Sequence, residues 1–286
     1  MPSAFFRRLL SLAGVLALPA LAAPPGSSSS PALLQVGVPD QAEGRAIIAQ
    51  FRQAGPPRPY YLDFELIRLP RRGAEQRYPG RLWGSRNETG TVLRIEIDPG
   101  TPTERRFLLQ NGVAASAWES DRLPAGLSEP KQVGLFTPLV PGLTVTPFDL
   151  EMPFLYWPNA QLLSITRVRG RTAHVFIFHP PTGAALPPAV AGVRAYLDTQ
   201  YHAPVQTEVL GRDDEVLKTF SLQDLKKVGE EWLPQEIDIR DEGSRDKGRF
   251  NVTGAALNLD LLPELFLPTS LDGRVAPPPE SARVRF

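Results

Sequence analysis

The sequence predicts a mainly β protein with a few helices, built around one large antiparallel sheet. From Tyr60 onward, apolar residues recur at every second position, which is the side-chain period of a β-strand. Short turn sequences separate these runs, whereas a clear helical pattern is confined to one segment near the start. So many consecutive hairpins must curl, either into a closed barrel or into a bent open sheet whose inside is covered by a helix, a loop or a ligand.

Residues 1–22 have the three parts of a secretory signal peptide. Arg7 and Arg8 precede an apolar run at residues 9–18, and Ala20-Leu21-Ala22 then offers a small-residue cleavage site. The apolar run is shorter than the roughly 20 residues that a membrane-spanning helix needs. We therefore expect cleavage near Ala22 and export of a soluble mature chain.

One helix is predicted shortly after the signal peptide. Residues 23–39 are rich in Gly, Pro and Ser and are expected to form a flexible leader. Asp40 is a suitable helix N-cap with Glu43 in the first turn, and the helix should end before Gly55. The apolar stripe of this helix consists of Ala46, Ile47, Ala49 and Phe51.

The first series of strands follows this helix. Apolar and mostly polar residues alternate around Phe64 and around Ile95, so each of these strands should have one apolar face. The sequences Asp98-Pro99-Gly100-Thr101 and Asn111-Gly112 favour tight turns, because proline presets φ and Asn-Gly tolerates positive φ. These turns predict consecutive hairpins.

The middle of the chain, residues 135–158, contains five prolines among several aromatic residues. Prolines at this density exclude a long regular element, so we expect a loop with one helical turn that packs on the sheet. A second series of strands is predicted at residues 162–168, 172–179, 193–198, 205–210, 216–222, 232–239 and 248–252. The prediction is thus a single β domain at residues 40–272 and a disordered tail at residues 273–286.

Charge and cysteine content exclude several kinds of partner and anchor. Removal of Arg7 and Arg8 with the signal peptide leaves 29 basic against 31 acidic side chains. A chain so close to neutrality has no broad positive electrostatic field that would attract nucleic acid. The sequence contains no cysteine, so neither a disulfide nor a thioether-linked lipid anchor is expected.

No motif for catalysis, for a metal or for a cofactor is recognisable. His174 and His179 share one predicted strand at positions that point to opposite faces, and His202 lies in a predicted turn. The acidic run Asp213-Asp214-Glu215 coincides with a turn and lacks the alternating oxygen ligands of a calcium loop. Because nucleophile, P-loop and dinucleotide motifs are also missing, we expect neither an enzyme nor a bound cofactor.

Seven segments of the second half, in this order and spacing, resemble one known family. They are WPNAQL from residue 157, VRGRTAHV from 168, VRAYLD from 193, VLKTF from 216, WLP from 232, GRFNV from 248 and LPELFLP from 262. This part of the chain resembles the outer-membrane lipoprotein-sorting family, the LolA-like carriers of the periplasm. The first half resembles that family only in having an initial helix followed by strands.

The resemblance implies a half-open β-barrel, closed by helices, whose apolar cavity shields acyl chains in the periplasm. The implied partners are a lipoprotein or other acylated lipid as cargo, an inner-membrane donor transporter and an outer-membrane acceptor. An acyl chain is held by apolar area, at about 0.8 kcal/mol per buried methylene, so no short signature is expected. The residues expected to line the cavity are Leu62, Phe64, Leu66, Trp83, Leu93, Ile95, Ile97, Phe176, Phe178, Ile237 and Ile239.

Three other functions are alternatives to a lipid carrier. A non-catalytic protein-binding module of the cell envelope, structural or signalling, would use the same fold without lipid. A hydrolase of lipid or glycan would need a buried pair of acidic side chains in a cleft. The alternating residues 282–286 suit the last strand of an outer-membrane barrel, but the prolines at 277–279 leave fewer than the roughly 9 to 11 residues needed.

Overall fold

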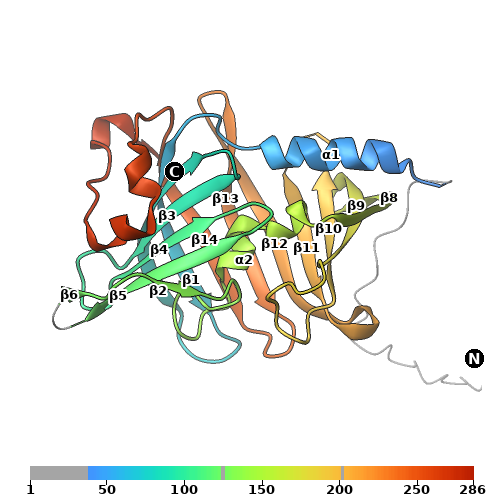
Figure 1. Cartoon of the computed structure of the whole chain (residues 1–286), viewed down its shortest axis with the longest axis horizontal. Helices are drawn as coiled ribbons and strands as arrows, with labels where there is room; N and C mark the ends of the chain where they lie inside the picture. Colours follow the sequence, from blue (N-terminus) through green and yellow to red (C-terminus); the bar gives the residue numbers. More distant parts are fainter. Residues whose placement is uncertain (1–37, 124–125, 201–202) are drawn as a thin grey trace, which may run out of the picture. The chain divides into compact units, whose positions relative to one another are not determined.

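The computed structural model describes residues 38–123, 126–200 and 203–286, and fifteen strands among them join into one antiparallel sheet (Figure 1). The predicted signal peptide, nearly all of the predicted leader and His202 lie outside the described residues. No helix in the described ranges is long and apolar enough to cross a membrane.

The strands form two groups along the chain. The first group is β1 (Tyr60–Leu69), β2 (Gln76–Arg86), β3 (Thr91–Ile97), β4 (Arg105–Gln110), β5 (Ser116–Leu123), β6 (Gly126–Leu127) and β7 (Lys131–Val133). The second group is β8 (Asn159–Val168), β9 (Arg171–His179), β10 (Gly192–Asp198), β11 (Pro204–Leu210), β12 (Val216–Val228), β13 (Glu231–Asp241), β14 (Lys247–Ala256) and β15 (Val284–Arg285).

Strands β1–β6 and strands β8–β14 are each a meander of hairpins, and the two meanders join where β1 pairs with β14. The path of the sheet runs β6-β5-β4-β3-β2-β1-β14-β13-β12-β11-β10-β9-β8, with β7 paired to β5 and β15 to β14. The end strands β6 and β8 do not pair with each other, so the sheet is open. The predicted mainly β, half-open fold is therefore confirmed, and the alternative of a closed barrel is excluded for the described residues.

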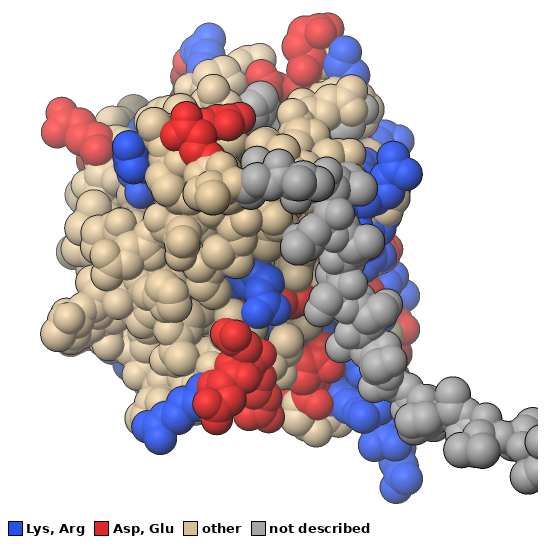
Figure 2. Space-filling view, turned by 90° about the vertical axis from the view of Figure 1, so that its right-hand side faces the viewer, with Lys and Arg blue, Asp and Glu red and all other residues tan. Residues whose placement is uncertain are grey.

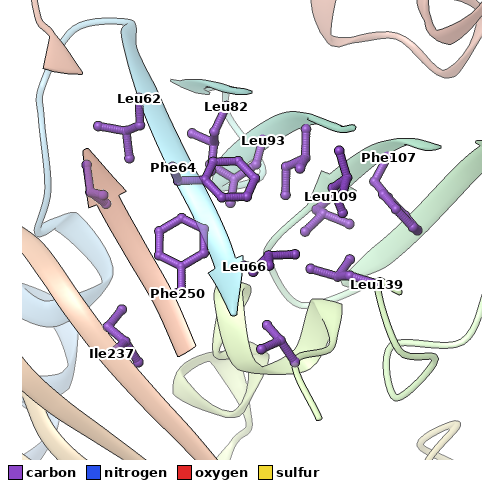
Figure 3. Close-up of a cluster of buried hydrophobic side chains, with 14 of the residues drawn as sticks. Leu62, Phe64, Leu66, Leu82, Leu93, Phe107, Leu109, Leu139, Ile237 and Phe250 are labelled. Atoms are coloured by element: carbon purple, nitrogen blue, oxygen red, sulfur yellow. The ribbon is translucent and has the colours of Figure 1, made fainter. Parts of the chain in front are cut away.

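Register places one continuous apolar face on the inside of this sheet. Phe64 of β1 lies opposite Val252 of β14, and its ring stacks on Phe250 with 4.7 Å between ring centroids (Figure 3). Gly80 of β2 faces Phe64, and a Cβ atom at Gly80 would lie 2.2 Å from the Phe64 ring. The buried residues of β1–β5 and β12–β14 on this face form what we name the central cluster.

Besides the strands, the described residues form two α-helices and five short 3-10 helices. They are α1 (Gln41–Gln53), α2 (Pro147–Glu151), η1 (Pro153–Tyr156), η2 (Arg212–Asp214), η3 (Pro263–Phe266), η4 (Pro268–Asp272) and η5 (Glu280–Ala282). As predicted, Asp40 caps α1, its carboxylate accepting from the N–H of Ala42 at 2.7 Å. Ile48 and Phe51 of α1 pack with η1 and with the inner face of β8–β11 in a second core, which we name the helix-covered cluster.

The edge strand β8 is partly blocked by α1. The side-chain amide of Gln41 donates to the carbonyl of Leu162 at 2.9 Å and accepts from its N–H at 3.0 Å. Figure 2 shows the molecule from the side on which β8 lies in Figure 1. Uncharged side chains fill much of the left half of this view, and charged ones lie mostly toward the margins. A partly capped edge is less available for pairing with another strand.

The outer face of β3 and β4 is covered as well, by the segment that contains η3 and η4 (Figure 1). Arg94 and Arg106 alternate with apolar residues on these strands, as solvent-facing residues do, yet both are fully buried. Arg94 donates to the carbonyl of Ser270 at 2.7 Å, and Arg106 donates to that of Leu271 at 2.9 Å. Two buried guanidinium groups thus fasten the C-terminal segment to the sheet.

The prediction of a disordered tail at residues 273–286 is corrected by the structure. Val284 and Arg285 form β15, which pairs with Gly254 and Ala255 of β14. This edge of β14 is free because β13 pairs with β14 only up to Asn251. Arg283 and Arg285 also bind the carboxylate of Asp63, at 3.0 and 3.1 Å, and so hold the segment on β1.

Candidate functional site

A cavity of about 760 Å³ lies on the inner face of the sheet, between the sheet and the ends of α1 and α2. This volume is within the roughly 300–1,000 Å³ that is usual for ligand pockets. Its apolar floor comes from the strands and consists of Leu62, Leu82, Leu93, Phe220, Leu222, Leu225, Leu233, Ile237 and Phe250. Its cover comes from the helical segments and includes Phe51, Leu150, Met152 and Leu155.

Helix α2 is held in place over this floor by polar contacts at its start. Thr146 is its N-cap, and its N–H and hydroxyl both donate to the carboxylate of Asp149, at 2.8 and 2.7 Å. The same carboxylate binds the ammonium group of Lys218 on β12 at 2.5 Å. Pro147 at the first position and the left-handed Met152 at the end limit the helix to little more than one turn.

The C-terminal end of α1 is fastened to the opposite side of the cavity by two arginines. Arg86 of β2 donates to the carbonyls of Arg52 and Ala54, at 2.7 and 3.1 Å, where helix carbonyls lack partners. Arg52 donates to the carbonyl of Leu155 at 2.8 Å and lies over the ring of Tyr156. Both guanidinium groups are bonded to backbone carbonyls at the side of the cavity, and the floor remains apolar.

Partly buried Tyr60 and buried Glu151 are ionisable groups of the cavity wall. Burial raises the pKa of Tyr60 to about 12, although nearby Arg86 acts in the opposite direction. Glu151, the last residue of α2, is 4% exposed, and burial raises the pKa of its carboxyl well above the ordinary value. The backbone carbonyl of Glu151 accepts from the side-chain amide of Asn111 at 2.5 Å.

The structure places the eleven predicted lining residues in four environments, of which the inner face of the sheet holds three. Leu62, Leu93 and Ile237 lie on the cavity wall. The others on the inner face are packed within the two cores, with Phe64, Leu66, Ile95, Ile97 and Ile239 in the central cluster and Phe176 and Phe178 in the helix-covered cluster.

Trp83 is the one predicted lining residue on the wrong face. It lies opposite Tyr61 in the register of β1 and β2, and both rings point to the outer face under the C-terminal segment. The two rings meet edge to face with 5.3 Å between centroids. Trp83 is therefore removed from the set of cavity residues.

Sequence reasoning missed most of the wall. The cover residues of α2 and η1 lie in the proline-rich middle, where no periodicity indicates which side chains face inward. Leu222 and Phe220 were within a predicted strand, but their face could be assigned only from the pairing of β12 with β13. Glu151 carried no signal, because an isolated glutamate is usually exposed.

A metal site and a pair of neighbouring acidic side chains are two other arrangements that could support catalysis. The described residues contain no group of three or more His, Asp or Glu side chains that could hold a metal ion. Glu119 and Asp121 on β5 are close enough to share a hydrogen bond, and Asp121 binds Arg105 at 3.0 Å and Lys131 at 3.4 Å. Neither carboxyl lies on the cavity wall, and both are neutralised by these cations.

The fold is shared with solved structures of low sequence identity. A DUF1329 family protein from Desulfovibrio piger has a TM-score of 0.68 at 12% identity, over 80% of this chain and 98% of that one. A putative outer membrane lipoprotein-sorting protein domain from Vibrio parahaemolyticus has a TM-score of 0.69 at 17% identity, over 82% and 100%. A LolA superfamily protein from Nitrosomonas europaea has a TM-score of 0.61 at 17% identity, over 78% and 96%.

These likenesses establish the fold across both halves of the sheet. No protein-family model matches the sequence, and no curated protein does so either. The described part of the chain therefore has the open, helix-covered β-sheet fold of LolA-superfamily and DUF1329 structures.

Proposed function

We propose that this protein is a periplasmic carrier that holds the acyl chains of a lipoprotein or another acylated lipid. The observation that carries the proposal is the apolar cavity of about 760 Å³ between the inner face of the sheet and the helical cover. Each methylene moved from water into such a cavity contributes about 0.8 kcal/mol. A chain of ten or so methylenes therefore gains enough to bind without any specific polar contact.

The construction of the cover supports binding and release without covalent chemistry. Besides the end of α1, the cover consists of two short segments that are held by a small number of polar contacts. Lys218 of β12 binds Asp149 of the one-turn α2, and Arg52 of α1 donates to the carbonyl of Leu155 in η1. Segments with few such contacts open at lower free energy than a sheet does. The carrier would accept cargo from a donor in the inner membrane and deliver it to an outer-membrane acceptor, as a lipoprotein-sorting protein would.

Native mass spectrometry of the purified protein tests this function. The protein is incubated with vesicles that contain a triacylated lipopeptide and is then separated from them. We expect a complex with one acylated molecule, which organic extraction removes. A protein that stays empty with every acylated compound, but retains a protein partner without lipid, would instead support the protein-binding module.

A further inference from the structure

Glu151 is an exception among the polar groups of the cavity wall. Both of its carboxyl oxygens are buried and have no hydrogen-bond partner among the described residues. The other buried side-chain atoms in this state belong to Arg68, Arg94, His174 and Arg283, and none of these residues lines the cavity. A buried polar group without a partner costs free energy, so its presence at a binding cavity suggests a partner supplied by the ligand.

The protonation state of Glu151 follows from its surroundings. Burial raises the pKa of its carboxyl well above the ordinary value of 4.5, and burial is the sole cause. The charged side chains that share the wall, Arg52, Arg86, Asp149, Glu230 and Glu231, contribute nothing to this shift. This shift favours the neutral acid, which has one O–H donor and one carbonyl acceptor.

Two polar contacts hold the backbone that carries this carboxyl in the closed cavity. Asn111 donates to the backbone carbonyl of Glu151, and Lys218 holds Asp149 two residues earlier. To reach a ligand, the carboxyl, which is covered in this structure, must turn toward the cavity by rotation about the side-chain bonds of Glu151.

We propose that the carboxyl of Glu151 donates a hydrogen bond to the carbonyl oxygen at the head of a bound acyl chain. This inference rests on the proposed carrier function and adds the polar contact that the apolar floor lacks. An acyl carbonyl loses its hydrogen bonds to water on entering the cavity, and a neutral O–H replaces one of them. Esters and amides both carry this carbonyl, whereas an alkyl ether or an amine does not.

The test compares three decyl probes in wild-type protein and in two variants. Methyl decanoate has the acyl carbonyl, decyl methyl ether lacks it, and decylamine brings a cation instead. Glu151→Gln keeps a neutral donor of the same size, and Glu151→Met keeps the size without the donor. Dissociation constants are measured by displacement of a fluorescent apolar dye at pH 6, after circular dichroism confirms that each variant is folded.

In the wild type we expect the ester to bind about three- to tenfold more tightly than the ether, which is the usual worth of one neutral hydrogen bond. Glu151→Gln should keep this preference and Glu151→Met should lose it. In the wild type the preference should also fall as the pH rises, because a carboxylate donates no hydrogen bond, and this measurement needs no variant.

Two results would overturn the inference while leaving the carrier function intact. One is an ester preference that is equal in the wild type and in Glu151→Met. The other is a preference for decylamine that is present in the wild type and lost in Glu151→Gln, because Glu151 would then bind a cation as a carboxylate. Failure of all three probes to bind the wild type would contradict the carrier function itself.

Discussion

Filling part of the cavity should weaken acyl binding strongly while the fold remains intact. Leu222 on β12 is part of the cavity floor, pairs with Ile237 of β13 and is 7% exposed. The substitution Leu222→Trp adds roughly six heavy atoms to the floor and should exclude about four methylenes of a bound chain. At about 0.8 kcal/mol for each methylene, the loss of binding free energy is about 3 kcal/mol. At 1.4 kcal/mol per tenfold, the acyl probe should bind about a hundredfold more weakly.

The assay is titration of the variant with a fluorescent acyl probe, accompanied by a thermal melt. Leu163→Trp is the matched control, since Leu163 lies on β8, is 40% exposed and does not line the cavity. It introduces the same side chain and should bind the probe as the wild type does. Equal affinities of both variants and the wild type, with Leu222→Trp folded, would refute the location of the binding site.

Three further predictions concern stability. Burial raises the pKa of Glu151 above 4.5, so the protonated group contributes to stability below pH 4.5, and this contribution is lost as the pH rises through the raised pKa. Glu151→Gln should therefore flatten the rise in melting temperature toward low pH, and parallel pH profiles of the variant and the wild type would contradict this. Arg106→Met breaks the 2.7 Å pair with Glu104 and should cost about 3–5 kcal/mol in urea unfolding, whereas a loss below about 1 kcal/mol would count against a structural role for this pair. Gly80→Ala should cost about 1–3 kcal/mol by overpacking against Phe64, and an unchanged unfolding midpoint would argue against that contact.

The sequence predicted the sheet well because strand periodicity is local. The alternation around Phe64 and Ile95 placed both on the inner face, and Leu62, Leu93 and Ile237 reach the cavity. The same alternation could not reveal what covers the outer face. Arg94 follows the pattern of a solvated residue, and its burial depends on carbonyls about 180 residues later in the chain.

The errors have similar causes. Trp83 directly follows another apolar residue, Leu82, so which of the two faces the inside of the sheet is not evident until the pairing of β2 with β1 is known. Residues 282–286 alternate, but the pairing of β15 depends on the edge that β13 leaves free on β14, which the local sequence does not show. The position of Glu151 in the wall depends on the tertiary placement of α2, to which the local sequence gives no guide.

Photo-crosslinking tests most directly whether acyl chains occupy the cavity. A fatty acyl probe with a diazirine near the end of its chain is bound, irradiated and mapped by peptide mass spectrometry. We predict adducts on the floor residues around Phe220 and Ile237 that excess unlabelled lipid removes. Adducts confined to the outer face beneath the C-terminal segment, or adducts that excess lipid does not reduce, would contradict the account.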